Sequence, residues 1–207
     1  MITYDEIELD SISEIINIGI NRSAAALGEL TEHEVMLSVP ILSIINAIDL
    51  VSELCASTDS VCGIFKRIIK PLESYAVVII PMRSRDDIVR FMLPQYLSRG
   101  QAESDYDDAV TEIGNIMIGA CLSSIADTLD IDIDLDQPVI HVEHPSEFFL
   151  TSIVVNDLCE YFLDVKIDMT VRDTPLAISW EFLLPDNAFE VIKEQMRRLG
   201  RVSAIGT

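Results

Sequence analysis

The sequence predicts an α+β fold that is internally duplicated, with a pseudo-two-fold relation between its halves and long helices covering a β-sheet layer. A polar pattern, Asp-x-x-x-Glu-x-x-Asn, occurs twice at an offset of 98 residues. Pro40 and Pro138 repeat at that same offset, and each follows an apolar helical pattern. Further along, residues 70–81 align with residues 174–185 at an offset of 104, with prolines and a leucine in register.

These alignments divide the chain into repeats at about 1–99 and 100–207. The chain has 207 residues, which suits one domain made of two small halves, 1–207. The joining segment around residue 100 is polar and short, as expected of a surface connection. The difference between the two offsets predicts a net insertion of six residues in the second half, around 141–150.

Each half is predicted to run helix, strand, strand, strand, helix. The long first helices are expected at 5–30 and 105–129, where apolar residues recur at helical spacing and small residues permit close packing. Runs of β-branched and aromatic residues predict the strands. The clearest of these lie at 35–39, 76–80, 162–171 and 177–184. Amphipathic stretches at 86–92 and 187–196 predict the closing helices.

The chain is strongly acidic, with 14 basic and 35 acidic side chains and a net charge of −21. This balance argues against nucleic-acid binding, which depends on Lys and Arg neutralising phosphates, and against docking on an anionic membrane. The opening residues lack the basic region of a secretory signal, and no apolar run approaches 18 residues. Four cysteines without metal-ligand spacing favour reduced, buried thiols in the cytoplasm.

The repeated polar pattern supplies the candidate site residues. They are Asp10, Glu14 and Asn17 in the first half, and Asp108, Glu112 and Asn115 in the second. Residues three and four apart share one face of a helix, so each copy sets a carboxylate beside a carboxamide. A solvated helix face is the simpler interpretation of one such cluster. The pattern persisted while most aligned positions changed, which favours two equivalent functional sites.

Glutamate and asparagine at this spacing can do specific chemistry. A carboxamide donates and accepts at once, so it can hold a water molecule by two contacts, although it is too weak a base to deprotonate that water. A glutamate can accept from a lysine ammonium. Such a pair could act on a partner that already carries a phosphoryl group, a metal and a lysine. Asp10 and Asp108 are expected to support these sites, either near a positive helix N-terminus or through a partner contact.

Other candidates are weaker on chemical grounds. His141 and His144 could ligate a metal, but their i, i+3 spacing in a Pro-flanked segment is not a strong metal signature. Ser11, Ser13 and Ser23 have no nearby histidine, so a nucleophilic triad is not indicated. Trp180, in a predicted strand, is expected in the core.

At these residues the chain resembles the CheC/CheX/FliY family of chemotaxis phosphatases. The pattern of that family, Asp or Ser, then Glu, then Asn near the start of a long helix, matches both clusters. The stretch EIGNIMIGACLSSIAD is especially similar to the second helix of the CheC branch. The stretch EIINIGINRSAAALGEL resembles the first but departs at residues 20–23. Two sites and no additional domain make the chain most like CheC. Because the second helix matches the family form more closely than the first, the second site is expected to be the more efficient.

The resemblance implies a protein-aspartyl-phosphate phosphatase, a hydrolase that dephosphorylates a phosphorylated CheY-type response regulator in the cytoplasm. Glu14 and Glu112 would bind the lysine of the regulator, and Asn17 and Asn115 would orient the attacking water. No cofactor of its own is implied, because the regulator would supply Mg²⁺. CheD, a receptor deamidase, is a second implied partner. The alternatives are a non-catalytic adaptor for CheD or another signalling protein, and an unrelated enzyme that uses the His141 region.

Overall fold

The computed structural model describes residues 6–56, 60–71, 74–92, 103–143, 160–173 and 177–200. Two long helices dominate it, α1 (Glu6–Thr31) and α5 (Glu103–Leu129). The shorter helices within the described residues are α2 (Ala47–Ala56), α3 (Arg85–Met92) and α7 (Asp186–Arg198), with the short 3₁₀ turn η1 at Met82–Ser84. The predicted long helices at 5–30 and 105–129 are thus confirmed to within two residues.

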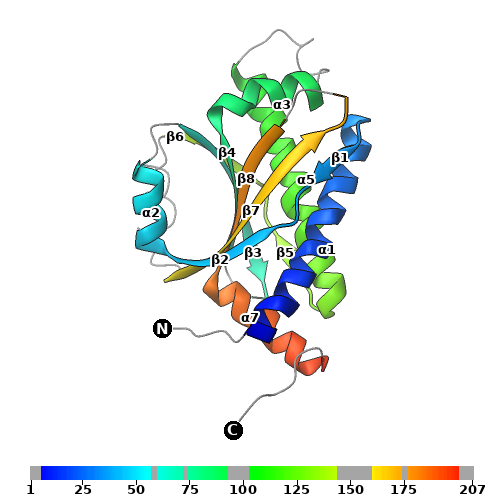
Figure 1. Ribbon diagram of the computed structural model, residues 1–207, viewed down its shortest axis with the longest axis vertical. Coiled ribbons are helices and arrows are strands. Elements are labelled where there is room, and N and C mark those ends of the chain that lie inside the picture. The colour runs from blue at the N-terminus through cyan, green and yellow to red at the C-terminus, as the bar shows by residue number, and fades with distance from the viewer. Residues whose placement is uncertain are drawn as a thin grey trace.

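The strands form one curled antiparallel sheet (Figure 1). Their bounds are β1 (Val35–Leu37), β2 (Ile41–Asn46), β3 (Val61–Lys70), β4 (Ser74–Pro81), β5 (Asp134–Leu135), β6 (Val139–Glu143), β7 (Tyr161–Val171) and β8 (Ala177–Pro185). Strands β4 and β8 pair at the centre of the sheet. On one side β3 pairs with β4, β5 and β6, and on the other β7 pairs with β8, β1 and β2.

This pairing order is the same when read outward from either side of the β4–β8 pair, as a pseudo-two-fold fold requires. The short strands β1 and β2 of the first half pair with β7 of the second, and β5 and β6 of the second pair with β3 of the first. Each half therefore completes the sheet of the other. The α+β class with its helix-covered, curled sheet is confirmed.

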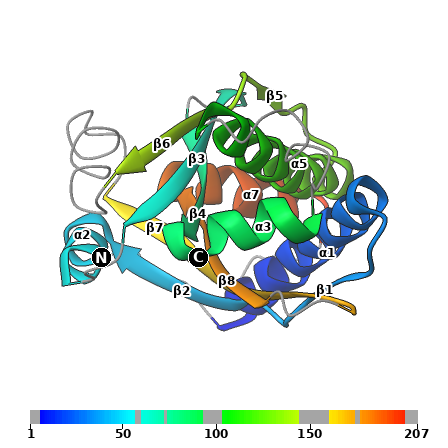
Figure 2. The same ribbon diagram turned by 90° about the horizontal axis from the view of Figure 1, so that it is seen from above.

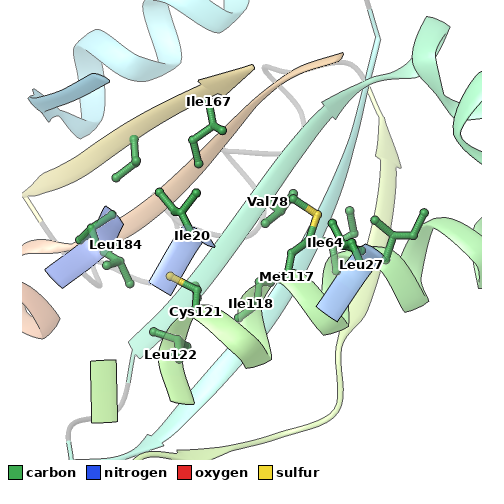
Figure 3. Packing of buried hydrophobic residues seen from close by; sticks show 14 of the residues in the cluster. Ile20, Leu27, Ile64, Val78, Met117, Ile118, Cys121, Leu122, Ile167 and Leu184 are labelled. Carbon is green, nitrogen blue, oxygen red and sulfur yellow. The ribbon is translucent and has the colours of Figure 1, made fainter. Parts of the chain in front are cut away.

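The main core lies between the sheet and the pair of helices α1 and α5, which run side by side (Figures 1 and 2). Figure 3 shows residues of α1 and α5, among them Ile20 and Met117, facing residues of the strands such as Ile64 and Ile167. A smaller core on the other face of the sheet includes Leu50 of α2. Helix α2 had no counterpart among the elements expected from the sequence.

Backbone geometry repeats at the ends of the two long helices. Glu32 follows α1 with φ of 57°, and Asp130 follows α5 with φ of 53°, so both helices end in a left-handed residue that is not glycine. The two positions are 98 residues apart, which is the offset of the polar pattern.

The registers of the two hairpins place the extra residues of the second half. Val61 pairs with Pro81 in the first hairpin, and Phe162 pairs with Pro185 in the second. When Pro81 is aligned with Pro185 at an offset of 104 residues, these registers align β3 with β7 at an offset of 101 residues. Three of the six extra residues therefore fall before β7 and three in the β7–β8 connection, whereas the sequence suggested one site around 141–150. Residues 144–159 lie outside the described part.

Helix α5 is long and apolar enough over Tyr106–Leu129 to cross a membrane by length and composition alone. More than half of its most apolar 18-residue window is buried inside the described fold, because α5 packs against α1 and the sheet. A central core helix has the same composition, so this feature is explained by the fold.

The two cysteines whose side chains are described, Cys62 and Cys121, are free and buried. Burial raises the pKa of each thiol to about 12. Both therefore remain protonated and unreactive at neutral pH.

Candidate functional site

Helix α1 carries the first cluster and helix α5 the second. Glu14 is exposed and Asn17 is half-buried one turn further on α1, whereas both Glu112 and Asn115 are half-buried on α5. Since both pairs are accessible, neither belongs to the core. The structure therefore leaves each Glu/Asn pair at the surface of its helix.

The two clusters lie on neighbouring helices that run in opposite directions. A Cβ added to Gly19 would lie 2.8 Å from Cys121 Sγ, and the buried Ser23 hydroxyl donates to the Met117 carbonyl at 2.8 Å. At the offset of 98, Gly19 corresponds to Met117 and Ser23 to Cys121, so each contact is the pseudo-two-fold equivalent of the other. The helices therefore cross at the midpoint between the two contacts, near residue 21 of α1 and residue 119 of α5. Asn17 and Asn115 each precede that midpoint by four residues, so they lie about 12 Å apart along the helix axes. The fold presents two separate sites.

The second cluster has a third member, Lys66. The Lys66 ammonium donates a hydrogen bond to Asn115 Oδ1 at 2.5 Å. Lys66 is half-buried on β3, and desolvation lowers the pKa of its ammonium, while the negative charge of Glu112 acts in the opposite direction. A lysine and an asparagine thus meet on one flank of α5, and the charge of Glu112 on the same helix acts on the lysine.

Sequence reasoning missed Lys66 as a site residue. Side chains alternate across a strand, so Lys66 follows Cys62 and Ile64 on the face of β3 that looks toward the long helices. The available signal was that a charged residue occupies one of the alternating positions of β3 whose other side chains are apolar and face the helices. Its partner could not be deduced, because Asn115 is 49 residues away in the sequence.

The first cluster is held differently. The Asn21 side-chain amide donates to the Asn17 carbonyl at 2.8 Å and lies 3.4 Å from Asn17 Oδ1. The hairpin registers make Ile167 of β7 the counterpart of Lys66, and Ile167 is a buried core residue. Among the described residues, no ammonium contacts Asn17.

The departure from the family pattern at residues 20–23 has a structural explanation. Ser23 donates to the Gly19 carbonyl at 3.1 Å as well as to that of Met117, so its hydroxyl helps to join the helices. Arg22 forms an ion pair with Asp127 of α5 at 2.7 Å. These residues serve the contact between the helices. The expectation that Ser23 is no nucleophile agrees with its burial.

Asp10 and Asp108 are both exposed, and both lie in the second turn of their helices. The field of a helix terminus falls off within the first turn. Their position therefore does not favour stabilisation of the helix dipole, and a contact with a partner stays a prediction.

The alternative metal site finds no support in the described part of the chain. The His141 ring packs edge-on against Phe65 with 5.3 Å between ring centroids, as a side chain packed on the sheet. His144 and the side chain of Trp180 lie outside the described residues. No group of three or more His, Cys, Asp or Glu side chains that could hold a metal ion occurs among those described.

Comparisons with known proteins fit this arrangement. A model of the CheC-like family matches residues 107–142, a stretch that contains the second cluster. The chain is 24% identical over 147 residues to the CheY-P phosphatase CheC of Bacillus subtilis, covering 67% of this chain and 68% of the relative.

Solved structures share the fold. The crystal structure of Thermotoga maritima FliY matches with a TM-score of 0.77 at 18% identity, over 95% of this chain and 99% of that one. The middle domain of Helicobacter pylori FliM matches with a TM-score of 0.66 at 11% identity, over 93% and all of the respective chains. Together these comparisons confirm that the chain resembles the CheC/CheX/FliY family.

Proposed function

We propose that this protein dephosphorylates a phosphorylated CheY-type response regulator, as a protein-aspartyl-phosphate phosphatase. One observation carries the proposal: the Glu/Asn pair occurs twice, on accessible faces of two pseudo-symmetric helices. The similarity to a CheY-P phosphatase supports the same activity.

In the proposed reaction the regulator contributes most of the chemistry. Glu112 and Glu14 would each accept from the active-site lysine of the regulator and so align the two proteins. Asn115 and Asn17 would orient a water whose oxygen attacks the phosphorus in line with the acyl oxygen. The P–O bond to the aspartyl carboxylate breaks, and inorganic phosphate leaves with the proton of the water. Positioning of this kind lowers the barrier without a covalent intermediate.

The proposal assigns no cofactor to this chain, and Mg²⁺ would come with the regulator. It places the protein in the cytoplasm, with the phosphorylated regulator as its partner and CheD as a second candidate partner. Neither nucleic acid nor a membrane is expected as a partner for so acidic a chain.

Removing both asparagines tests the proposal. Asn17→Ala with Asn115→Ala should abolish accelerated phosphate release from a phosphorylated CheY-type regulator. The fold should persist, since neither residue belongs to the core and losing the hydrogen bond between Lys66 and Asn115 costs only about 1 kcal/mol. Phosphate release, corrected for spontaneous hydrolysis, is the measurement. Ser123→Ala, an exposed polar change on α5, serves as the matched control.

Full activity in the double variant would show that the site is assigned wrongly. If the unaltered protein accelerates release from none of a panel of CheY-type regulators yet still binds one, the adaptor function replaces the phosphatase.

A further inference from the structure

The contact between Lys66 and Asn115 fixes which way the carboxamide of Asn115 faces. An ammonium carries only donors, so it selects Oδ1 and turns Nδ2 to the other side of the planar group. The remaining lone pair of Oδ1 and both Nδ2 hydrogens stay available for a water. The orientation therefore follows from the chemistry of the partner.

Holding a lysine in this place costs free energy, because half-burial disfavours its charged form. The charge of Glu112 and the hydrogen bond to Asn115 offset part of that cost. The lysine has room beside Gly119, one turn beyond Asn115, because even a Cβ there would lie 3.9 Å from Lys66 Nζ, an ordinary van der Waals distance. The lysine and the carboxamide thus form one hydrogen-bonded unit, and the charge of Glu112 favours the ammonium form of the lysine.

The first site has no such unit in the described part of the chain. Its carboxamide oxygen faces only the neutral amide of Asn21 at 3.4 Å, a long contact. The position equivalent to Lys66 is the buried Ile167. The two pairs share residue types but differ in what holds the asparagine.

We propose that Lys66 is a positioning residue of the second site, whose ammonium preorients the Asn115 carboxamide for the attacking water and makes that site the faster of the two. This inference rests on the proposed phosphatase function. Preorientation matters for rate because reacting groups held near their productive geometry need less reorganisation in the transition state.

Single-site backgrounds isolate the effect. In an Asn17→Ala background, where only the second site works, Lys66→Met should lower kcat about ten-fold and change KM much less. Lys66→Arg should recover part of kcat, because it also presents only donors. In an Asn115→Ala background Lys66→Met should have no effect. Lys70→Met, at an exposed lysine of the same strand, is the matched control.

The side-chain amide of Asn115 gives a readout that needs no regulator. Its ¹⁵N relaxation in the free protein should show an ordered amide that becomes mobile in Lys66→Met, whereas the amide of Asn17 should not change. Unchanged order at Asn115 would overturn the positioning role. A higher kcat in the Asn17→Ala, Lys66→Met protein would also overturn it, because Lys66 would then obstruct the site. If the unaltered protein has no phosphatase activity, the catalytic consequence is refuted, and the relaxation result still decides whether Lys66 holds Asn115.

Discussion

Gly19 of α1 lies directly against Cys121 of α5. A Cβ at Gly19 would meet Cys121 Sγ at 2.8 Å, the carbonyl oxygen of Cys121 at 2.9 Å and its Cα at 3.3 Å. Two of these three atoms belong to the backbone of α5, so no rotation of a side chain would relieve the clash. The absence of a side chain at Gly19 therefore sets how closely the two site-bearing helices approach.

Gly19→Ala should consequently destabilise the protein. Forcing a methyl group into a packed contact costs about 1–3 kcal/mol, whereas alanine gains about 1 kcal/mol over glycine in helix propensity. A net loss of up to about 2 kcal/mol in the free energy of unfolding is expected, measured by urea denaturation. Gly119→Ala is the control, since its Cβ would find only Lys66 Nζ at 3.9 Å and should leave stability unchanged or improved. Equal effects of the two substitutions would refute the close approach at Gly19.

Local patterns were sufficient to predict the long helices and the two polar clusters. The amphipathic period and the repeated spacing are properties of short segments, so α1 and α5 were found with nearly correct ends. Helix α2 was missed because its ten residues follow an apolar strand without a clear boundary. The exchange of short strands between halves is a long-range pairing, as between Val35 and Val171, which no local pattern specifies.

The candidate site was likewise predictable from local patterns only in part. The Glu and Asn positions followed from helix periodicity, because one helix carries each pair. Lys66 lies on strand β3, and its contact with Asn115 depends on how α5 packs against the sheet. Contacts between elements that are distant in sequence require the packed fold.

Asp164 predicts a pH dependence of stability. Its side chain on β7 is 1% exposed, and burial raises the pKa of its carboxyl above the usual 3.8. Lys166, at 3.5 Å, and the Ser43 hydroxyl, at 3.4 Å, offset this effect only in part, and Glu53 adds to it. The folded state therefore holds the proton more tightly than the unfolded state does. The contribution of Asp164 to stability improves as pH falls from neutral through the raised folded pKa toward 3.8.

Asp164→Asn should remove this dependence. At pH 7.5 the variant is expected to be more stable than the unaltered protein, because it buries no charge, and its advantage should shrink at about pH 4, close to the pKa of 3.8 expected for the unfolded state. Urea denaturation of both proteins at the two pH values measures the difference, in which the repulsion among the remaining acidic residues largely cancels. An advantage that stays constant between the two pH values would show that Asp164 does not titrate in this range.

Glu112 and Asn115 should separate binding from turnover. In a background that carries both Glu14→Ala and Asn17→Ala, Glu112→Ala should weaken association with the regulator carrying beryllofluoride, a stable mimic of the phosphoryl group, because a charge-assisted contact to lysine is lost. Asn115→Ala should preserve that association and lower turnover, since orienting a water matters mainly in the transition state. Titration calorimetry and phosphate release measure the two effects.

Lys66 complicates the interpretation of Glu112→Ala, because the charge of Glu112 also favours the ammonium form of Lys66. Lys66→Met is therefore measured beside it, and a loss of affinity confined to Glu112→Ala assigns the contact to the regulator. If Asn115→Ala abolishes binding while Glu112→Ala leaves it intact, the two roles are reversed. If neither substitution changes binding or turnover, the second cluster is an ordinary solvated helix face, and the duplication of its pattern reflects ancestry alone.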